Sequence, residues 1–251
     1  MSGAPAPLLD VRDLSKSFGG VRALGRVSLT VDRGEVVGVI GPNGAGKTTL
    51  FNVLCGLAPN GGQIVFKGED VTGLASHQIC HRGIARTFQL TRPFVELSIL
   101  DNVAAAVLFG QRHDGAMSLR EARDRAGAIL TEVKLDRRPA SLAGDLLFAE
   151  RRRLELARAV ATEPELLLLD EVMAGLTVAE AQDMVEILEK LRRERQLTLL
   201  VIEHVMKVVM AICDRIVVLN YGEKLCEGRP AEVAAHQAVI DAYLGTERAG
   251  G

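Results

Sequence analysis

Alternation of apolar and polar residues marks the first part of the chain. Residues 8–11, 26–31 and 63–66 carry this pattern, and Gly, Asp and Lys residues typical of turns lie between them. A period of two turns one face of a strand toward a core and the other toward solvent. The pattern therefore predicts an N-terminal antiparallel β lobe.

Continuous apolar runs indicate strands that are buried on both faces. One run covers residues 35–40 and leads into a helical pattern over residues 47–57. Two others, residues 166–169 and 197–202, are separated by a charged amphipathic stretch at 178–195. Strand, helix and parallel strand follow one another in this way in α/β proteins. We therefore expect an α/β fold with a mainly parallel core sheet.

A different pattern occupies the middle of the chain. Strand signals disappear over residues 102–138, where Ala, Leu, Arg and Glu dominate, and Ser118 followed by Glu121 has the spacing of a capping box. We expect a helical lobe here, with limits at about residues 90–160.

The C-terminal part ends the predicted sheet. Residues 215–219 and 223–226 flank a turn at 220–222, which predicts a hairpin at the sheet edge. No internal repeat is present, so one copy of any site is expected. We predict a single domain over residues 8–245, followed by a disordered tail at 246–251.

Composition narrows the class of protein. The 251 residues are 48% hydrophobic and 25% charged, as in a globular protein with a sizeable core, and the net charge of −2 gives no basic field for nucleic acid. No apolar run approaches the ~20 residues that span a bilayer, and the N-terminus lacks the features of a signal peptide. The four cysteines lack metal-ligand spacing. We expect a cytoplasmic protein with free thiols and only peripheral membrane contact.

The clearest motif follows the buried strand at 35–40. It has the form G-x-x-x-x-G-K-[ST], in which glycine-rich backbone amides and a helix N-terminus bind phosphates. Lys47 is expected to reach the β and γ phosphates, Thr48 to bind Mg²⁺, and Thr49 to contact the α phosphate. The residues of this phosphate loop are Gly41, Pro42, Asn43, Gly44, Ala45, Gly46, Lys47 and Thr48.

Two adjacent carboxylates end the run at 166–169. Strand alternation sends Asp170 and Glu171 to opposite sides, so Asp170 can bind Mg²⁺ through water while Glu171 polarises the water that attacks the γ phosphate. This pair indicates hydrolysis of the nucleotide.

From Leu9 to Gly245 these motifs, in this order, resemble the ATP-binding subunits of ABC transporters. The resemblance implies the ABC ATPase fold, ATP and Mg²⁺ as cofactors, and roles for three further residues. Phe18, in the run KSFGG, resembles the aromatic residue that stacks on adenine. Gln89 resembles the glutamine that senses Mg²⁺ and the attacking water, and His204 resembles the switch histidine that contacts the γ phosphate.

Three segments resemble the subfamily that drives branched-chain amino acid importers: GIARTFQ at 83–89, residues 174–176, and residues 220–245. The resemblance implies a dimer of ATP-binding subunits beneath two membrane-spanning permease subunits, at the inner face of the cell membrane. An extracytoplasmic binding protein would deliver the substrate. Residues 91–97 would contribute to docking on the membrane subunit.

One segment departs from the family pattern. Where the family has a signature similar to Leu-Ser-Gly-Gly-Gln, this chain has a run in which position 147 lacks a hydroxyl and position 149 adds a methyl group close to the expected phosphate. Thr177 likewise replaces a frequent Asp. The sequence leaves a homodimer and a heterodimer both open. Our hypothesis is an asymmetric heterodimer in which this chain's own site faces an intact partner signature. The degenerate run is Leu146, Leu147, Phe148, Ala149 and Glu150.

Other interpretations stay open from the sequence. A phosphate-loop kinase or GTPase shares the first motif only, whereas Gln89, Asp170, Glu171 and His204 together favour an ATPase. A non-transport ABC ATPase acting in DNA repair or translation is a second alternative. A third is a regulatory subunit that binds ATP with little hydrolysis, which Leu147 favours.

Overall fold

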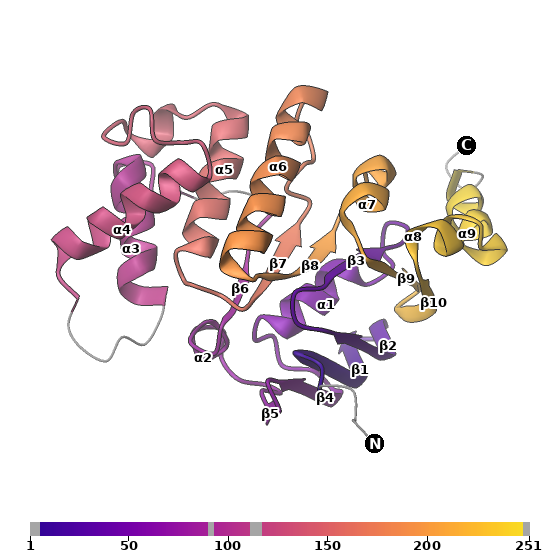
Figure 1. The fold of residues 1–251 in the computed structure, drawn as a ribbon. Coiled ribbons are helices and arrows are strands. Elements are labelled where there is room, and N and C mark those ends of the chain that lie inside the picture. The colour runs from indigo at the N-terminus through magenta and orange to yellow at the C-terminus, as the bar shows by residue number, and fades with distance from the viewer. Residues whose placement is uncertain (1–5, 90–92, 111–116, 248–251) are drawn as a thin grey trace, which may run out of the picture. The chain divides into compact units, whose positions relative to one another are not determined.

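The structure is a computed structural model that describes residues 6–89, 93–110 and 117–247. The chain divides into two compact units, residues 1–76 with 198–251 and residues 77–197. The first unit is discontinuous, because the indigo N-terminal and yellow C-terminal segments in Figure 1 both belong to it. The second unit is a single stretch between them.

The first unit contains the predicted antiparallel lobe. Its strands pair in the order β2-β1-β4-β5, and all their pairings are antiparallel. Buried and exposed positions alternate along much of these strands, as a sheet with one face on the core requires. The strands are β1 (Leu9–Phe18), β2 (Val21–Val31), β4 (Gly61–Phe66) and β5 (Glu69–Asp70).

The same unit contains a mainly parallel sheet with one antiparallel edge. β3 (Val36–Ile40) lies between β8 (Thr198–Ile202) and β9 (Arg215–Asn220) and is parallel to both, and β10 (Glu223–Gly228) forms the predicted hairpin with β9. All five residues of β3 and of β8 are buried, which explains their continuous apolar sequences. The helices are α1 (Lys47–Leu54), α7 (Met206–Ile212), α8 (Pro230–Ala234) and α9 (Gln237–Glu247), and α2 (Ser76–Cys80) begins at the end of the unit's first segment.

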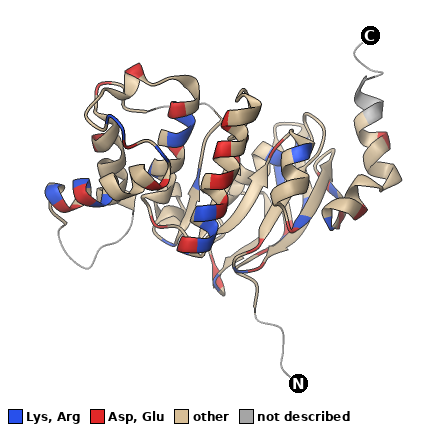
Figure 2. Cartoon of the chain, turned by 45° about the horizontal axis from the view of Figure 1, so that its top comes forward, with Lys and Arg blue, Asp and Glu red and all other residues tan. Residues whose placement is uncertain are grey.

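The second unit combines a strand pair with the predicted helices. β6 (Ile84–Arg86) is parallel to β7 (Leu166–Asp170), and the helices are α3 (Ile99–Gly110), α4 (Leu119–Glu132), α5 (Phe148–Val160) and α6 (Val178–Arg195), with a 3₁₀ turn at Ala143–Asp145. The capping box predicted at the start of α4 is confirmed, since Ser118 and Glu121 each bind the other's backbone amide. Figure 2 shows acidic and basic residues along the length of α6. Among the described residues, no helix has both the length and the apolar character needed to cross a bilayer.

One predicted boundary is wrong. α1 ends at Leu54 rather than residue 57, because Gly56 leaves the helical conformation with a φ of +106°. Glycine is required there, since a Cβ would lie 2.7 Å from the amide nitrogen of Ser76. Of the predicted tail, residues 246 and 247 are assigned to the end of α9, and a disordered tail from residue 246 stays a prediction. The rest of the predicted tail, residues 248–251, lies outside the described residues.

Candidate functional site

The phosphate loop connects β3 to α1 in the first unit. Gly41, Gly44 and Gly46 have φ values of +151°, +78° and +101°, which favour glycine. A Cβ on Gly41 would lie 2.1 Å from the carbonyl oxygen of Leu219, and one on Gly46 would lie 2.5 Å from that of Ala23. Backbone conformation and close backbone packing therefore both require glycine at the two ends of the loop.

The loop delivers the chain into a helix whose first turn suits an anion. Gly46 is the N-cap of α1, it provides no side-chain hydrogen bond, and the first turn contains no acidic residue. Helix N-terminal amides point away from the helix and carry partial positive charge. Thr48 is exposed and Thr49 half-buried in this turn. The local structure thus agrees with phosphate binding.

Lys47 is the first residue of α1, directly after the glycines of the loop, and is only 6% exposed. Its Nζ donates hydrogen bonds to the carbonyl oxygens of Gly41, at 2.7 Å, and Pro42, at 2.9 Å. An ammonium has three donors and no acceptor, so these carbonyls satisfy two of them while holding the charge over the loop.

Segments far away in sequence hold the backbone of the loop. The Gly222 amide donates to the carbonyl of Ala45, at 3.1 Å, and the Gly222 carbonyl accepts from Gly25, at 2.7 Å. From α9, the phenol oxygen of Tyr243 accepts a hydrogen bond from the Gly41 amide, although burial has the larger effect and raises the pKa of Tyr243. The C-terminal hairpin and α9 therefore hold the backbone of the phosphate loop by hydrogen bonds. No sequence motif predicts this role.

Phe18 and His204 also belong to the first unit. Phe18 ends β1, is 49% exposed, and has the ammonium of Lys16 5.2 Å from the centre of its ring. His204 is exposed and follows β8 by two residues. Since Val39 pairs with Ile202 in parallel register, Gly41 and His204 leave adjacent strands at the same edge of the sheet. The register thus gives His204 a place next to the start of the phosphate loop.

In the second unit, Asp170 is held at the end of β7. Its carboxylate accepts a hydrogen bond from Arg86, at 2.6 Å, within an ion pair that is almost completely buried. Its backbone amide donates to the hydroxyl of Thr87, at 3.1 Å, and the Thr87 amide donates to the Leu168 carbonyl. Sequence reasoning missed Arg86 and Thr87. Their signal was a charged and a polar residue directly after two apolar residues of a short parallel strand.

Glu171 and Gln89 come together in the same unit. The amide Nε2 of Gln89 donates to Glu171 Oε2 at 2.6 Å. Strand alternation was the wrong reason for the separation of Asp170 and Glu171, because β7 ends at Asp170 and Glu171 turns out of the strand with a φ of +50°. A left-handed backbone at a residue other than glycine costs about 1–2 kcal/mol. The surrounding contacts must therefore hold this turn.

Comparison with known proteins agrees with these motifs. A family model described as ABC transporter matches residues 24–174, more than half of the chain. BraF, a high-affinity branched-chain amino acid transport ATP-binding protein of Pseudomonas aeruginosa, is 43% identical over 250 residues, which cover 95% of this chain and 98% of BraF. The chain belongs to the ABC transporter family, as an ATP-binding and ATP-hydrolysing subunit. ABC subunits of this kind work with membrane permease partners.

Further matches support the ABC assignment. The model of the branched-chain amino acid ATP-binding cassette transporter matches residues 223–249. The lipopolysaccharide export system ATP-binding protein LptB of Escherichia coli K12 is 35% identical over 240 residues, which cover 95% of this chain and 98% of LptB. The structure of the ADP conformation of MJ1267, an ATP-binding cassette of an ABC transporter, superimposes with a TM-score of 0.86 at 30% identity, covering 96% of this chain and 99% of MJ1267. The ABC ATPase fold predicted from the sequence is confirmed.

The run assigned to the ABC signature lies at the start of α5. Leu147 is its N-cap, is 71% exposed and offers no side-chain hydrogen bond. Glu150 accepts from the Leu147 amide, at 2.9 Å, and from Arg138, at 2.8 and 2.9 Å. Burial alone would raise the pKa of Glu150, but these hydrogen bonds outweigh it and hold the pKa below the usual value. The polar atoms of Glu150 thus serve the chain's own fold.

The loop after Glu171 in this ABC subunit packs on the same run. Gly175 has a φ of +80°, and a Cβ there would lie 3.1 Å from the ring of Phe148. Thr177 follows as the N-cap of α6: its hydroxyl accepts from the Glu180 amide, and Glu180 accepts from the Thr177 amide. Thr177 therefore has a structural role of its own where the wider family often has Asp.

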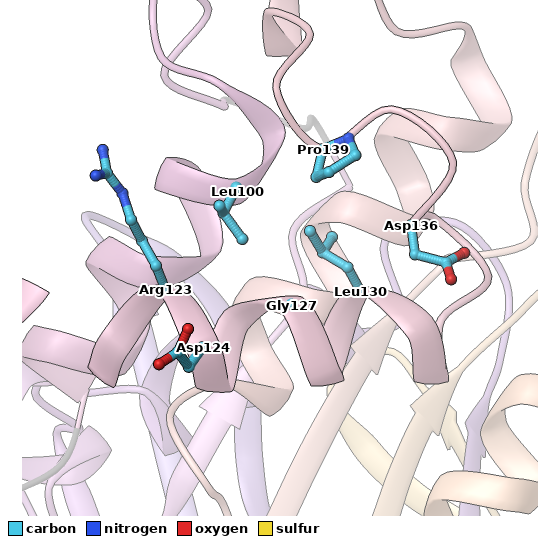
Figure 3. A pocket seen from close by; sticks show the side chains of 7 residues that line it. All are labelled: Leu100, Arg123, Asp124, Gly127, Leu130, Asp136 and Pro139. Carbon is cyan, nitrogen blue, oxygen red and sulfur yellow. The ribbon is translucent and has the colours of Figure 1, made fainter. Parts of the chain in front are cut away.

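A separate hollow of about 320 Å³ opens on the second unit (Figure 3). Its volume would admit a small molecule, but none of the predicted site residues lines it. The lining comes from α3, α4 and the segment after α4, and includes Leu100, Arg123, Asp124, Leu130, Asp136 and Pro139.

Proposed function

We propose that this chain powers the uptake of branched-chain amino acids or similar small polar solutes. The match of the branched-chain cassette model to residues 223–249 carries this proposal, because those residues include β10, α8 and α9 and extend beyond the general ABC match. The identity to BraF supports it. The relation to LptB is weaker, at 35%, and makes an export system the alternative.

Within this function the phosphate loop binds ATP. The amides of residues 41–46 and the first turn of α1 surround the phosphates, Lys47 exchanges its carbonyl partners for the β and γ phosphates, and Thr49 contacts the α phosphate region. Phe18 presents an exposed ring on which adenine stacks.

Thr48, Gln89 and Asp170 are the proposed Mg²⁺ ligands. Hydroxyl, amide and carboxylate oxygens are the donor set that Mg²⁺ prefers, and no thiol or imidazole competes among them. Bound there with ATP, Mg²⁺ would supply positive charge that neutralises the phosphate oxygens. Arg86 holds the Asp170 carboxylate in place through the buried ion pair.

Glu171 is the proposed general base. Its carboxylate accepts from Gln89, which leaves it oriented to take a proton from the attacking water. His204 is proposed to contact the γ phosphate from the edge that follows β8. Each side chain thus contributes one step: Lys47 binds, Gln89 orients, Glu171 accepts the proton and His204 contacts the transferred group.

The proposed partners are two permease subunits in the cell membrane, a second ATP-binding subunit and, indirectly, an extracytoplasmic substrate-binding protein. The chain would lie at the inner, cytoplasmic face of the membrane. Of the predicted docking segment, Thr91 lies outside the described residues, whereas Phe94, Val95 and Leu97 are 52%, 50% and 40% exposed. Exposed apolar side chains so close in sequence support a protein contact here. No nucleic acid is proposed as a partner.

Hydrolysis is tested with the purified full chain and Mg²⁺-ATP. Glu171→Gln is expected to lower turnover by about 100-fold or more while ATP still binds, since the amide cannot take the proton. Wild-type binding without turnover would instead favour a regulatory ATP-binding subunit, an alternative that Leu147 supports. In cells, Glu171→Gln should abolish uptake of radiolabelled leucine, and unchanged uptake would count against the proposed substrate class.

We further propose that the second ATP-binding subunit differs from this chain, because the Leu147 side chain has no hydroxyl and Glu150 is already bound by Arg138. Mixing the chain with a related ATP-binding subunit is expected to give ATPase activity well above the sum of the two alone. Losing a charge-assisted hydrogen bond costs about 1.5–3 kcal/mol, or more than tenfold in rate. Activity no greater than the sum would contradict the heterodimer.

A further inference from the structure

Two charged side chains of α5 hold the short segment that carries Gln89. The carboxylate of Glu155 accepts a hydrogen bond from the Phe88 amide. The guanidinium of Arg152 donates to the carbonyl of Phe88, at 3.3 Å, and to that of Gln89, at 2.8 Å. Three backbone groups of the two successive residues Phe88 and Gln89, beyond the end of β6, are thus bound by one helix.

Burial sets these two side chains apart from the other charges on α5. Arg152 is 6% exposed and Glu155 9% exposed. Taking charges out of water is costly unless hydrogen bonds compensate. They lie three residues apart on one face of α5, attract each other electrostatically, and hydrogen-bond to the Phe88 and Gln89 backbone, while the Nε of Arg152 is buried without a hydrogen-bond partner. Apolar residues often replace a buried ion pair without loss of stability, so stability alone does not account for these two side chains, and their contacts favour a positional requirement.

The backbone position of Gln89 determines where its side-chain amide can lie. The Gln89 carbonyl is bound to Arg152, and the side-chain amide of the same residue donates to Glu171 at 2.6 Å. A glutamine side chain turns freely about its torsions, so its amide returns to the same place only when its backbone is fixed. The backbone contacts of α5 therefore determine how Gln89 meets Glu171.

Arg152 also contacts the start of its own helix. Its guanidinium lies 5.1 Å from the centre of the Phe148 ring, within cation–π distance. The Phe148 ring in turn packs against Gly175, in the loop that follows Glu171. Arg152 thus contacts both the degenerate signature run, at Phe148, and the backbone of Gln89.

We propose that Arg152 and Glu155 are positioning residues that fix the Phe88–Gln89 backbone, so that Gln89 orients Glu171, and that Arg152 relays the position of Phe148 to this pair. The inference rests on the proposed roles of Gln89 and Glu171.

The first test follows the Gln89 side-chain amide by NMR in the full chain, with the signal assigned by its loss in Gln89→Ala. Arg152→Met is expected to shift this signal and to accelerate amide exchange at Phe88. Arg153→Met is the matched control, because Arg153 also lies on α5 but binds Asp183 on α6, at 3.0 Å, and should leave the Gln89 signal unchanged. Glu155→Gln keeps an acceptor oxygen and should retain the Phe88 protection that Glu155→Ala loses.

The second test is a double-mutant cycle on Mg²⁺-ATP turnover. Arg152→Met should lower kcat by about tenfold or more, with KM for ATP changed less than about threefold, since the phosphate loop is untouched. On a Gln89→Ala background the same substitution should cost less than about threefold, because its effect passes through Gln89.

Losses that multiply fully in the cycle, or an unchanged Gln89 signal in Arg152→Met, would overturn the inference. If Arg152→Met fails to fold, Arg152→Lys, which cannot bind two carbonyls in the same fixed geometry, supplies the same comparison against Arg153→Met. Failure of the proposed function would give a different result. In that case Gln89→Ala and Glu171→Gln would leave ATP turnover unchanged, whatever the NMR signal of Gln89 shows.

Discussion

At the scale of single residues, the phosphate loop depends on where side chains are missing. Gly41 and Gly44 both have positive φ values, but only Gly41 has a neighbour in the space that a Cβ would occupy, the carbonyl oxygen of Leu219. Conformational strain and steric exclusion are therefore separable within one loop. The motif treats Gly41 and Gly44 alike, whereas the structure predicts that replacing each by a larger residue costs a different amount of stability.

Gly41→Ala is expected to lower the free energy of unfolding by about 2 kcal/mol or more, because β9 must move away from the loop. Gly44→Ala has only the left-handed backbone to overcome and should cost about 1 kcal/mol. Urea denaturation of the two variants measures the difference. Equal losses would mean that the Leu219 contact can relax without cost.

At the scale of elements, the sequence predicted what depends on local pattern. α6 was expected at 178–195 and has these bounds, and the capping box of α4 and the β9–β10 hairpin are also present. Contacts between segments far apart in sequence could not be predicted, because no local period encodes them. Tyr243 binding Gly41 and Arg86 binding Asp170 are of this kind. The same limit applied to Glu171, whose turn out of β7 overrode strand alternation.

Thr177 provides a test at the N-terminus of α6. Thr177→Ala removes the oxygen that accepts from the Glu180 amide and should lower stability by about 1 kcal/mol. Thr177→Asp keeps a cap and restores the acid frequent in the family, so its stability should stay close to wild type. Thermal unfolding compares the two. If both variants lose the same stability, the cap does not stabilise α6.

At the scale of the whole molecule, one buried carboxyl links stability to pH. Burial, as the main cause, raises the pKa of Glu155 to about 7 from 4.5, against the opposing effects of the Phe88 amide, Arg152 and Arg158. Between these two values the folded chain keeps a proton that the unfolded chain has released. The folded state therefore binds more protons, and its stability falls as pH rises through this window.

Glu155→Gln removes this titration. The unfolding free energy of wild type, measured in urea from pH 5 to 8, should fall with rising pH more steeply than that of Glu155→Gln, by up to about 1.4 kcal/mol per pH unit below pH 7. Above about pH 7 the two curves should run parallel. Parallel curves throughout would mean that Glu155 is ionised at all these values.

The turn between β9 and β10 has a consequence for anyone who engineers this chain. Tyr221 is 83% exposed, so the turn looks like a natural place to insert a tag, open a new terminus or lengthen a loop. Its neighbour Gly222 bonds to Ala45 and Gly25, and Leu219 packs against Gly41. An insertion there would displace the phosphate loop through these contacts. A fusion site chosen by surface exposure alone would therefore disrupt nucleotide binding.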